Sequence, residues 1–306
     1  MNIRSGVSRT VEGNTAIAAA VALGVAAVTY LLGVLNPWGQ ALEAGLVGSL
    51  HALPAISAVV RVAAIVVPLG LIVVAVLAVA LPLANSRDWR AVWVVGFSAF
   101  SAFAVAAVIL LAAPRPAFTG DLAWGTGTSF PSPLLAASVG LAVATPQVVA
   151  PAARAGAHQF AAWGPALVAV LLCAGLWNRP SDVVGGAAIG VAAALVVCVT
   201  NGSYLRRLAT PAVDLRRSWL VRGWALAAAA LLATAAVGAL VALVAGAAAR
   251  ELSAALAVAG SAGLAGLFTV AGGLIVRNAL ARADLLRGTE TPTDHAPARR
   301  VAERES

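Results

Sequence analysis

The chain has 306 residues, of which 61% are hydrophobic and only 10% are charged, and its mean hydropathy is +0.94. Soluble domains carry about 25% charged residues, so this composition excludes a cytosolic enzyme, a nucleic-acid-binding domain and a disordered chain. We expect an all-α integral membrane protein, because a helix satisfies its own backbone hydrogen bonds in lipid. All 20 basic residues are arginine, set against 12 acidic residues. The lack of lysine beside abundant alanine is typical of a GC-rich bacterial genome, so we expect a bacterial plasma-membrane protein.

Eight apolar runs follow one another along the chain, and a membrane-spanning helix needs about 20 apolar residues. None of the eight contains Asp, Glu, Lys or Arg. They lie near residues 15–35, 62–84, 91–113, 133–153, 161–178, 183–200, 223–249 and 253–276. The sequence therefore predicts about eight transmembrane helices. Because ion-coupled carriers usually place ionisable groups in mid-membrane, the lack of such groups disfavours a proton- or sodium-coupled carrier.

The arginines set the orientation of these helices, since arginine gathers in cytoplasmic segments. With the N-terminus inside, 16 of the 20 arginines fall on the cytoplasmic side, and an even number of helices places both termini there. We divide the chain into a cytoplasmic N-tail (1–14), a six-helix core (15–200), a cytoplasmic loop with two further transmembrane helices (201–276) and a basic, disordered cytoplasmic tail (277–306).

Three smaller features concern packing and the surface. Segment 36–54 is too polar and too short to span, so we expect it to lie on the outer surface as an interfacial helix. Cys173 and Cys198 fall in apolar runs at depths that differ by roughly 16 Å, too far for a disulfide, so both are expected to be small core residues. Gly186 and Gly190 form a small-xxx-small step that predicts close helix packing.

Polar side chains gather in three segments that the topology places at the outer end of the bundle. They follow the third run at Arg115, enter the fourth at Ser132, and separate the fifth run from the sixth at Arg179 and Asp182. An arginine, a hydroxyl group and helix N-termini together can bind an anion. The same residues also have a structural interpretation, in which Arg115 begins a loop and Ser132 and Asp182 cap helices. The sequence has no zinc spacing, phosphate-binding glycine loop or Ser-His-Asp set, and we expect neither a metal nor a cofactor.

The order and spacing of these segments resemble the type 2 phosphatidic acid phosphatase family, the membrane relatives of the vanadium haloperoxidases. That family has a six-helix core and three motifs, K-x6-R-P, P-S-G-H and S-R-x5-H-x3-D, in the same topological positions. This chain has R-P at 115–116, S-F-P-S at 129–132 and P-S-D-V-V-G-G-A-A-I-G at 180–190. G-Q-A-L-E at 39–43 is similar to the segment before the family's second helix. The resemblance covers residues 15–200 and implies a lipid-phosphatase-like core.

The departures from the motifs concern the residues that the family uses for catalysis. In the family, one histidine attacks phosphorus and another protonates the leaving group, while a lysine and two arginines hold the phosphoryl oxygens. In this chain the positions hold Val108 for the lysine, Leu134 for the acid histidine, Asn178 for the nucleophile and Leu172 for one arginine. An amide nitrogen is not a usable nucleophile, and leucine cannot donate a proton. The resemblance therefore implies a degenerate member with no intact catalytic residue.

The expected function is binding of a lipid phosphate or an isoprenoid phosphate at the outer end of the bundle, or action through partner membrane proteins. The residues expected to bind the headgroup are Arg115, Ser132, Arg179 and Asp182. One alternative is an active lipid or isoprenyl (di)phosphate phosphatase with a rearranged site, for which His51 would have to approach the outer end. The other alternative is a structural membrane subunit or an uncoupled lipid carrier. The expected partners are membrane lipids, lipid phosphates and membrane proteins, but not nucleic acid.

Overall fold

The structure is a computed structural model. It describes residues 3–50, 89–113, 130–149, 154–174 and 177–202, positions 115, 116, 118, 204 and 205, and scattered residues within 62–73 and 260–276. The elements are α1 (Ile3–Thr29), the π-helix η1 (Tyr30–Val34), α2 (Pro37–Leu50), α4 (Trp89–Ala112), α5 (Pro133–Val148), α6 (Arg154–Ala174) and α7 (Pro180–Thr200). The described part of the chain is all-α, as its composition predicted.

Among the residues that the structure describes, four helices are long and apolar enough to cross a membrane. They lie at Thr15–Val34, Trp89–Ala112, Gly156–Cys173 and Pro180–Thr200. Helix α5 is also apolar but shorter, with 16 residues. These helices confirm a membrane protein. The run 223–249 lies outside the described residues, and the run 62–84 lies almost entirely outside them, so a total of eight spans stays a prediction.

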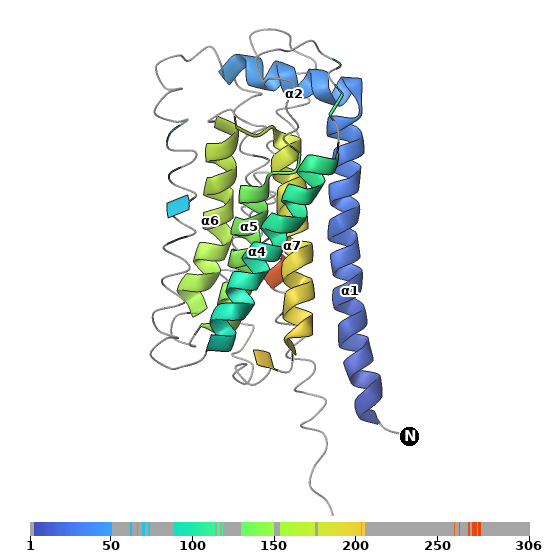
Figure 1. The fold of residues 1–306 in the computed structure, drawn as a ribbon, viewed down its shortest axis with the longest axis vertical. Coiled ribbons are helices and arrows are strands. Elements are labelled where there is room, and N and C mark those ends of the chain that lie inside the picture. The colour runs from blue at the N-terminus through green and yellow to red at the C-terminus, as the bar shows by residue number, and fades with distance from the viewer. Residues whose placement is uncertain are drawn as a thin grey trace, which may run out of the picture.

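The long helices stand side by side, and α2 lies across one end of them (Figure 1). We call this the α2 end of the bundle, where α1, α4 and α6 finish and α5 and α7 begin. Helix α7 packs against α1, α4 and α5, and α5 also packs against α4 and α6. Most residues of α5 and α7 are therefore buried, whereas α1 and α4 present large apolar side chains outward. Helices that are apolar all round belong in the centre of a bundle, and the outward apolar faces suit lipid tails.

Two glycines set the close approach of α7 to α5. A Cβ atom built on Gly186 would lie 2.6 Å from the carbonyl oxygen of Ser132, and one on Gly190 would lie 2.6 Å from that of Ala136. Real Cβ atoms do not approach an oxygen so closely, so only glycine allows the two helix backbones to lie at this separation. Gly186 and Gly190 are therefore packing residues, as their small-xxx-small spacing predicted.

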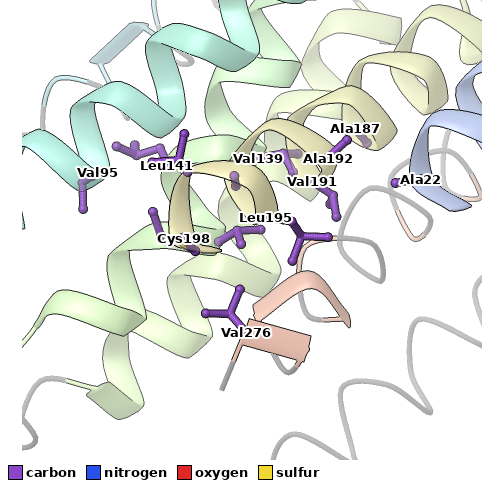
Figure 2. Packing of buried hydrophobic residues seen from close by; sticks show 14 of the residues in the cluster. Ala22, Val95, Val139, Leu141, Ala187, Val191, Ala192, Leu195, Cys198 and Val276 are labelled. Atoms are coloured by element: carbon purple, nitrogen blue, oxygen red, sulfur yellow. The ribbon is translucent and has the colours of Figure 1, made fainter. Parts of the chain in front are cut away.

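The apolar core is centred on α5 and α7 and also takes in residues of α1, α4 and α6 (Figure 2); Leu141 and Leu195 within it are almost completely buried. Val276, from the last apolar run, belongs to the same cluster. The amide nitrogen of Gln147 on α5 donates a hydrogen bond to the carbonyl oxygen of Gly273 at 3.4 Å. The last run lies outside the segment that resembles the phosphatase family, and its described residues Gly272, Gly273 and Val276 contact α5, α7 or the apolar core. Both cysteines are buried and neither forms a disulfide, as the sequence predicted.

Two helix boundaries differ from those that hydropathy indicates. Residues 3–14, expected as a cytoplasmic tail, continue α1 as helix. Helix α6 begins at Arg154, well before the expected run 161–178, so Arg154 is the first residue of a helix rather than part of a loop. Hydropathy marks only the part of a helix that lies in hydrocarbon, whereas helical hydrogen bonding continues into the flanking residues.

Candidate functional site

A group of polar side chains meets at the α2 end of the bundle. They come from α2, from the loop after α4, and from the chain at the start of α5 and α7. All of them are largely removed from solvent. We call this group the polar network, and its members are Glu43, Arg115, Ser132, Asn178, Arg179 and Asp182. The structure thus brings together the four residues that the sequence analysis expected to bind a headgroup, and it adds an acid that was not expected.

Arg115 joins two carboxylates in the polar network. Its Nη1 atom lies 3.1 Å from Oδ1 of Asp182, and its Nη2 atom lies 2.8 Å from Oε2 of Glu43. The side chains of Arg115, Glu43 and Asp182 are 6%, 8% and 0% exposed. Ion pairs this deeply buried need further hydrogen bonds to offset the loss of water around the charges. Arg115 therefore forms an ion pair with Asp182 and shares its charge with Glu43 as well.

The start of α7 supplies further hydrogen bonds to both carboxylates. The backbone N–H of Ser181 donates to Oε1 of Glu43 at 2.8 Å, and the backbone N–H of Arg179 donates to Oδ2 of Asp182 at 2.8 Å. The first N–H groups of a helix have no partner within the helix, and its dipole favours negative charge there. Asp182 is the third residue of α7, and its side chain accepts a hydrogen bond from the residue before the helix. The structural interpretation made Asp182 the N-cap, but Arg179 holds that position.

Ser132 connects the start of α5 to the start of α7. As the N-cap of α5, its Oγ atom accepts a hydrogen bond from the N–H of Leu135 and donates one to Oδ1 of Asn178 at 3.2 Å. Its own N–H donates to the carbonyl oxygen of Asp182 at 3.0 Å. Ser132 therefore has the capping role that was one of its two interpretations. Asn178 stands where the resemblance places the nucleophile, and here it accepts a hydrogen bond.

Helix α2 is fixed to the bundle through Gln40. Its Nε2 atom donates to the carbonyl oxygens of Val34 and Pro116, both at 2.6 Å, and its Oε1 atom accepts from the N–H of Phe118 at 3.3 Å. Val34 is the last residue of η1, where carbonyl groups lack partners within the helix. One side chain thus joins the end of the first span, the loop after α4 and α2. This attachment determines where Glu43 stands.

Burial changes the protonation equilibrium of Glu43. Removal from water raises the pKa of Glu43 above its ordinary value of 4.5, and the neighbouring negative charge of Asp182 raises it further. Hydrogen bonding to Ser181 and the positive charge of Arg115 lower this pKa but do not cancel the rise. The ionised form is disfavoured because the carboxylate has lost its water and shares one guanidinium with a second acid.

The positions that the resemblance assigns to catalysis hold no reactive group. Val108 is 64% exposed on the outer surface of α4, Leu172 is buried in the core, and Leu134 packs against that core. His158 lies near the start of α6, at the far end of the bundle from α2, and His51 lies outside the described residues. Within the described part of the chain, no group of three or more His, Cys, Asp or Glu residues could hold a metal ion.

Sequence reasoning missed two buried residues of α2: Glu43, which belongs to the polar network, and Gln40, which attaches α2 beside it. Segment 36–54 was expected on the surface, and α2 does lie across the end of the bundle. The unexpected feature was which face of α2 turns inward. As whole residues, Gln40 and Glu43 are 2% and 6% exposed, whereas Trp38 and Leu42 are 85% and 45% exposed. The available signal was the spacing, since two polar residues three apart share one face of a helix.

The fold and the polar network define a helical membrane protein with buried ion pairs at one end of its bundle. Comparisons with family models, with curated proteins and with solved structures give no match for this chain. Membership of the type 2 phosphatidic acid phosphatase family is therefore a proposal that rests on the sequence segments and on the place where they meet.

Proposed function

We propose that this chain is a catalytically degenerate relative of the lipid phosphatases that binds a lipid phosphate or an isoprenoid phosphate without hydrolysing it. The proposal includes a bacterial plasma membrane, eight spans, a six-helix core of the phosphatase type and both termini in the cytoplasm. One observation carries it. The three motif-like segments meet at the α2 end, where Arg115 pairs with Asp182 and the N–H of Ser132 bonds to the Asp182 carbonyl.

The donors at the α2 end suit an oxyanion. The guanidinium of Arg115 and the N–H of Ser181 at the start of α7 both donate to one carboxylate, that of Glu43. Guanidinium groups and helix N-termini are the usual protein donors to phosphate oxygens. A phosphate group offers the same negative charge and acceptor oxygens as this carboxylate, so the donor set fits a phosphate headgroup.

The same site does not support hydrolysis. Asn178 accepts a hydrogen bond from Ser132, and its amide nitrogen has no lone pair available for attack on phosphorus. Leu134 has no proton to give to a leaving group. Phosphoryl transfer depends mainly on positive charge around the transferred group, and in this site the charge of Arg115 is already divided between two acids.

A structural role is the second candidate, and a specific observation favours it. Arg115 makes two ion pairs and is 6% exposed, so the network satisfies its own charges without a ligand. Such a network fixes α2, the loop after α4 and the start of α7 relative to one another. In this role the protein serves as a subunit or a docking partner for other membrane proteins.

The test uses the purified full-length chain in lipid nanodiscs that contain phosphatidic acid, an isoprenyl phosphate, or phosphatidylcholine alone. We expect no phosphate release, and binding of fluorescent phosphatidic acid that competes with the unlabelled lipid. Arg115→Gln should abolish this competition. Arg90→Gln is the matched control, because Arg90 is exposed at the other end of α4.

Two results would replace the proposal by one of its alternatives. Equal retention of phosphatidic acid and phosphatidylcholine would favour the structural role. Phosphate release above background would show an active enzyme, and its loss in His51→Ala would show that His51 belongs to a rebuilt site.

A further inference from the structure

We infer that Glu43 is a built-in competitor for the proposed headgroup: its carboxylate occupies the oxyanion position between Arg115 and the start of α7, and must leave before a phosphate group binds. This inference rests on the proposed function. The ligand class is a phosphate monoester, and the group that excludes it belongs to the chain itself.

Both carboxylate oxygens of Glu43 accept the hydrogen bonds that a bound anion would accept. Oε2 lies 2.8 Å from Nη2 of Arg115, and Oε1 accepts the N–H of Ser181 at 2.8 Å. The position is thus defined by a guanidinium and a helix N-terminus, and it already contains an oxyanion. A phosphate group cannot take the same two donors while Glu43 holds them.

Arg115 also has a donor left over. Its Nε–H is buried and meets no hydrogen-bond acceptor in the described part of the chain. A carboxylate has two oxygens, and here they are satisfied by one nitrogen of Arg115 and by Ser181. A phosphate monoester has three terminal oxygens, so it can engage more of the guanidinium than Glu43 does.

The rest of α2 holds Glu43 in place. Gln40 bonds to Val34, Pro116 and Phe118, and a Cβ atom on Gly39 would overlap the carbonyl oxygen of Leu32. These contacts involve no charged group. The ion pair with Arg115 is therefore the contact by which charge controls access to the oxyanion position.

A fall in pH should weaken the ion pair between Glu43 and Arg115. Among the residues that the structure describes, the charged groups that act on Glu43 are Arg115 from the loop after α4 and Asp182 from α7. Protonation of Glu43 removes its ion pair with Arg115, while Asp182 still holds the other side of the guanidinium. Burial raises the pKa of Glu43, so this release occurs above the pH at which an exposed glutamate would be protonated.

The test measures phosphatidic acid binding in nanodiscs and inorganic phosphate binding in detergent for the wild type, Glu43→Gln and Glu43→Ala. We expect both variants to bind phosphatidic acid at least about tenfold more tightly, because neither keeps a charged competitor for the hydrogen bonds of Arg115 and Ser181. If the affinity for inorganic phosphate rises by the same factor, the site recognises the phosphate group alone. A rise in affinity for phosphatidic acid only shows that the acyl chains take part in binding. Gln40→Ala is the control, because it removes the uncharged contacts of α2 with Val34, Pro116 and Phe118 and keeps the carboxyl group of Glu43.

The outcomes separate this inference from the proposed function. Unchanged affinity in folded Glu43 variants, with binding by the wild type, would overturn the inference and leave the function intact. No binding by any form would overturn both. A gain in Gln40→Ala equal to that in Glu43→Gln would show that loosening of α2 is sufficient, against a competing carboxylate.

The wild type supplies a test that needs no folded variant. Sulfate keeps its charge between pH 4.5 and 7.5, and its saturable binding at low millimolar concentration should strengthen as the pH falls. Sulfate affinity that does not change with pH would contradict a carboxylate competitor.

Discussion

Glu43 and Ser181 are 138 positions apart in the sequence, yet the carboxylate of Glu43 accepts a 2.8 Å hydrogen bond from the backbone N–H of Ser181. The same carboxylate pairs with Arg115. These two contacts connect α2, which lies across the end of the bundle, to the start of its most buried candidate span. The stability of this end of the bundle should therefore depend on charge.

Removal of Arg115 should destabilise the protein more than removal of Asp182. Arg115→Met leaves two buried carboxylates without their common cation, and the loss of one partner of a buried ion pair costs about 3–5 kcal/mol. Asp182→Asn keeps an acceptor for the Arg179 N–H and leaves Arg115 paired with Glu43. Thermal unfolding of both variants in detergent measures the difference. Arg90→Met is the exposed control, and equal losses for Arg115 and Arg90 would contradict a structural ion pair.

Alanine at Gly190 should be harmful, whereas alanine at Gly24 should be tolerated. At Gly190 the new methyl group would lie 2.6 Å from the carbonyl oxygen of Ala136 and 2.8 Å from the Cβ atom of Val139. Overpacking of this kind costs about 1–3 kcal/mol. Gly24 has no atom within 4 Å of a built Cβ, and Gly→Ala in an open helix position gains up to about 1 kcal/mol. Unfolding temperatures of the two variants should move in opposite directions, and a parallel shift would argue against close packing of α5 and α7.

The pH dependence of stability should differ between the wild type and Glu43→Gln. The folded protein raises the pKa of Glu43 above 4.5, chiefly because burial removes water from the carboxylate. The folded state then binds this proton more tightly than the unfolded state does. The resulting stabilisation is complete below the unfolded pKa and is lost as the pH rises through the folded pKa.

The comparison is made as the free energy of unfolding of the wild type minus that of Glu43→Gln. This difference should fall as the pH rises above 4.5 and become constant once Glu43 is ionised in both states. A difference that grew with pH would mean that the pKa of Glu43 is lowered, and that Arg115 outweighs the burial.

Cysteine labelling should place the α2 end of the bundle outside the cell. The two native cysteines are buried and are replaced by alanine in the background chain. Phe118→Cys, at an exposed position beside Gln40, should react with an impermeant maleimide in intact cells. Gly156→Cys, exposed near the start of α6, should react only after lysis. The reverse pattern would invert the topology and place the polar network in the cytoplasm.

The membrane helices could be predicted from sequence because hydropathy is a property of each segment alone. The runs 15–35, 91–113 and 183–200 correspond closely to spans in the structure. The start of α6 at Arg154 could not be predicted in this way, since helical hydrogen bonds extend past the apolar part. The contact of Val276 with the core could not be predicted either, because packing between segments far apart in the sequence has no periodic pattern in that sequence.

The sequence by itself determined that this is a helical membrane protein, and that Arg115, Ser132 and Asp182 follow one another at the ends of successive apolar runs. Only the tertiary structure decided that Arg115 forms ion pairs with two acids, Glu43 and Asp182. The reason lies in α2, whose polar residues Gln40 and Glu43 face the bundle while Trp38 faces away from it. An amphipathic segment specifies two faces. Which face turns inward depends on the free energy of the groups it meets, and here buried donors from Arg115 and the start of α7 favour the carboxylate.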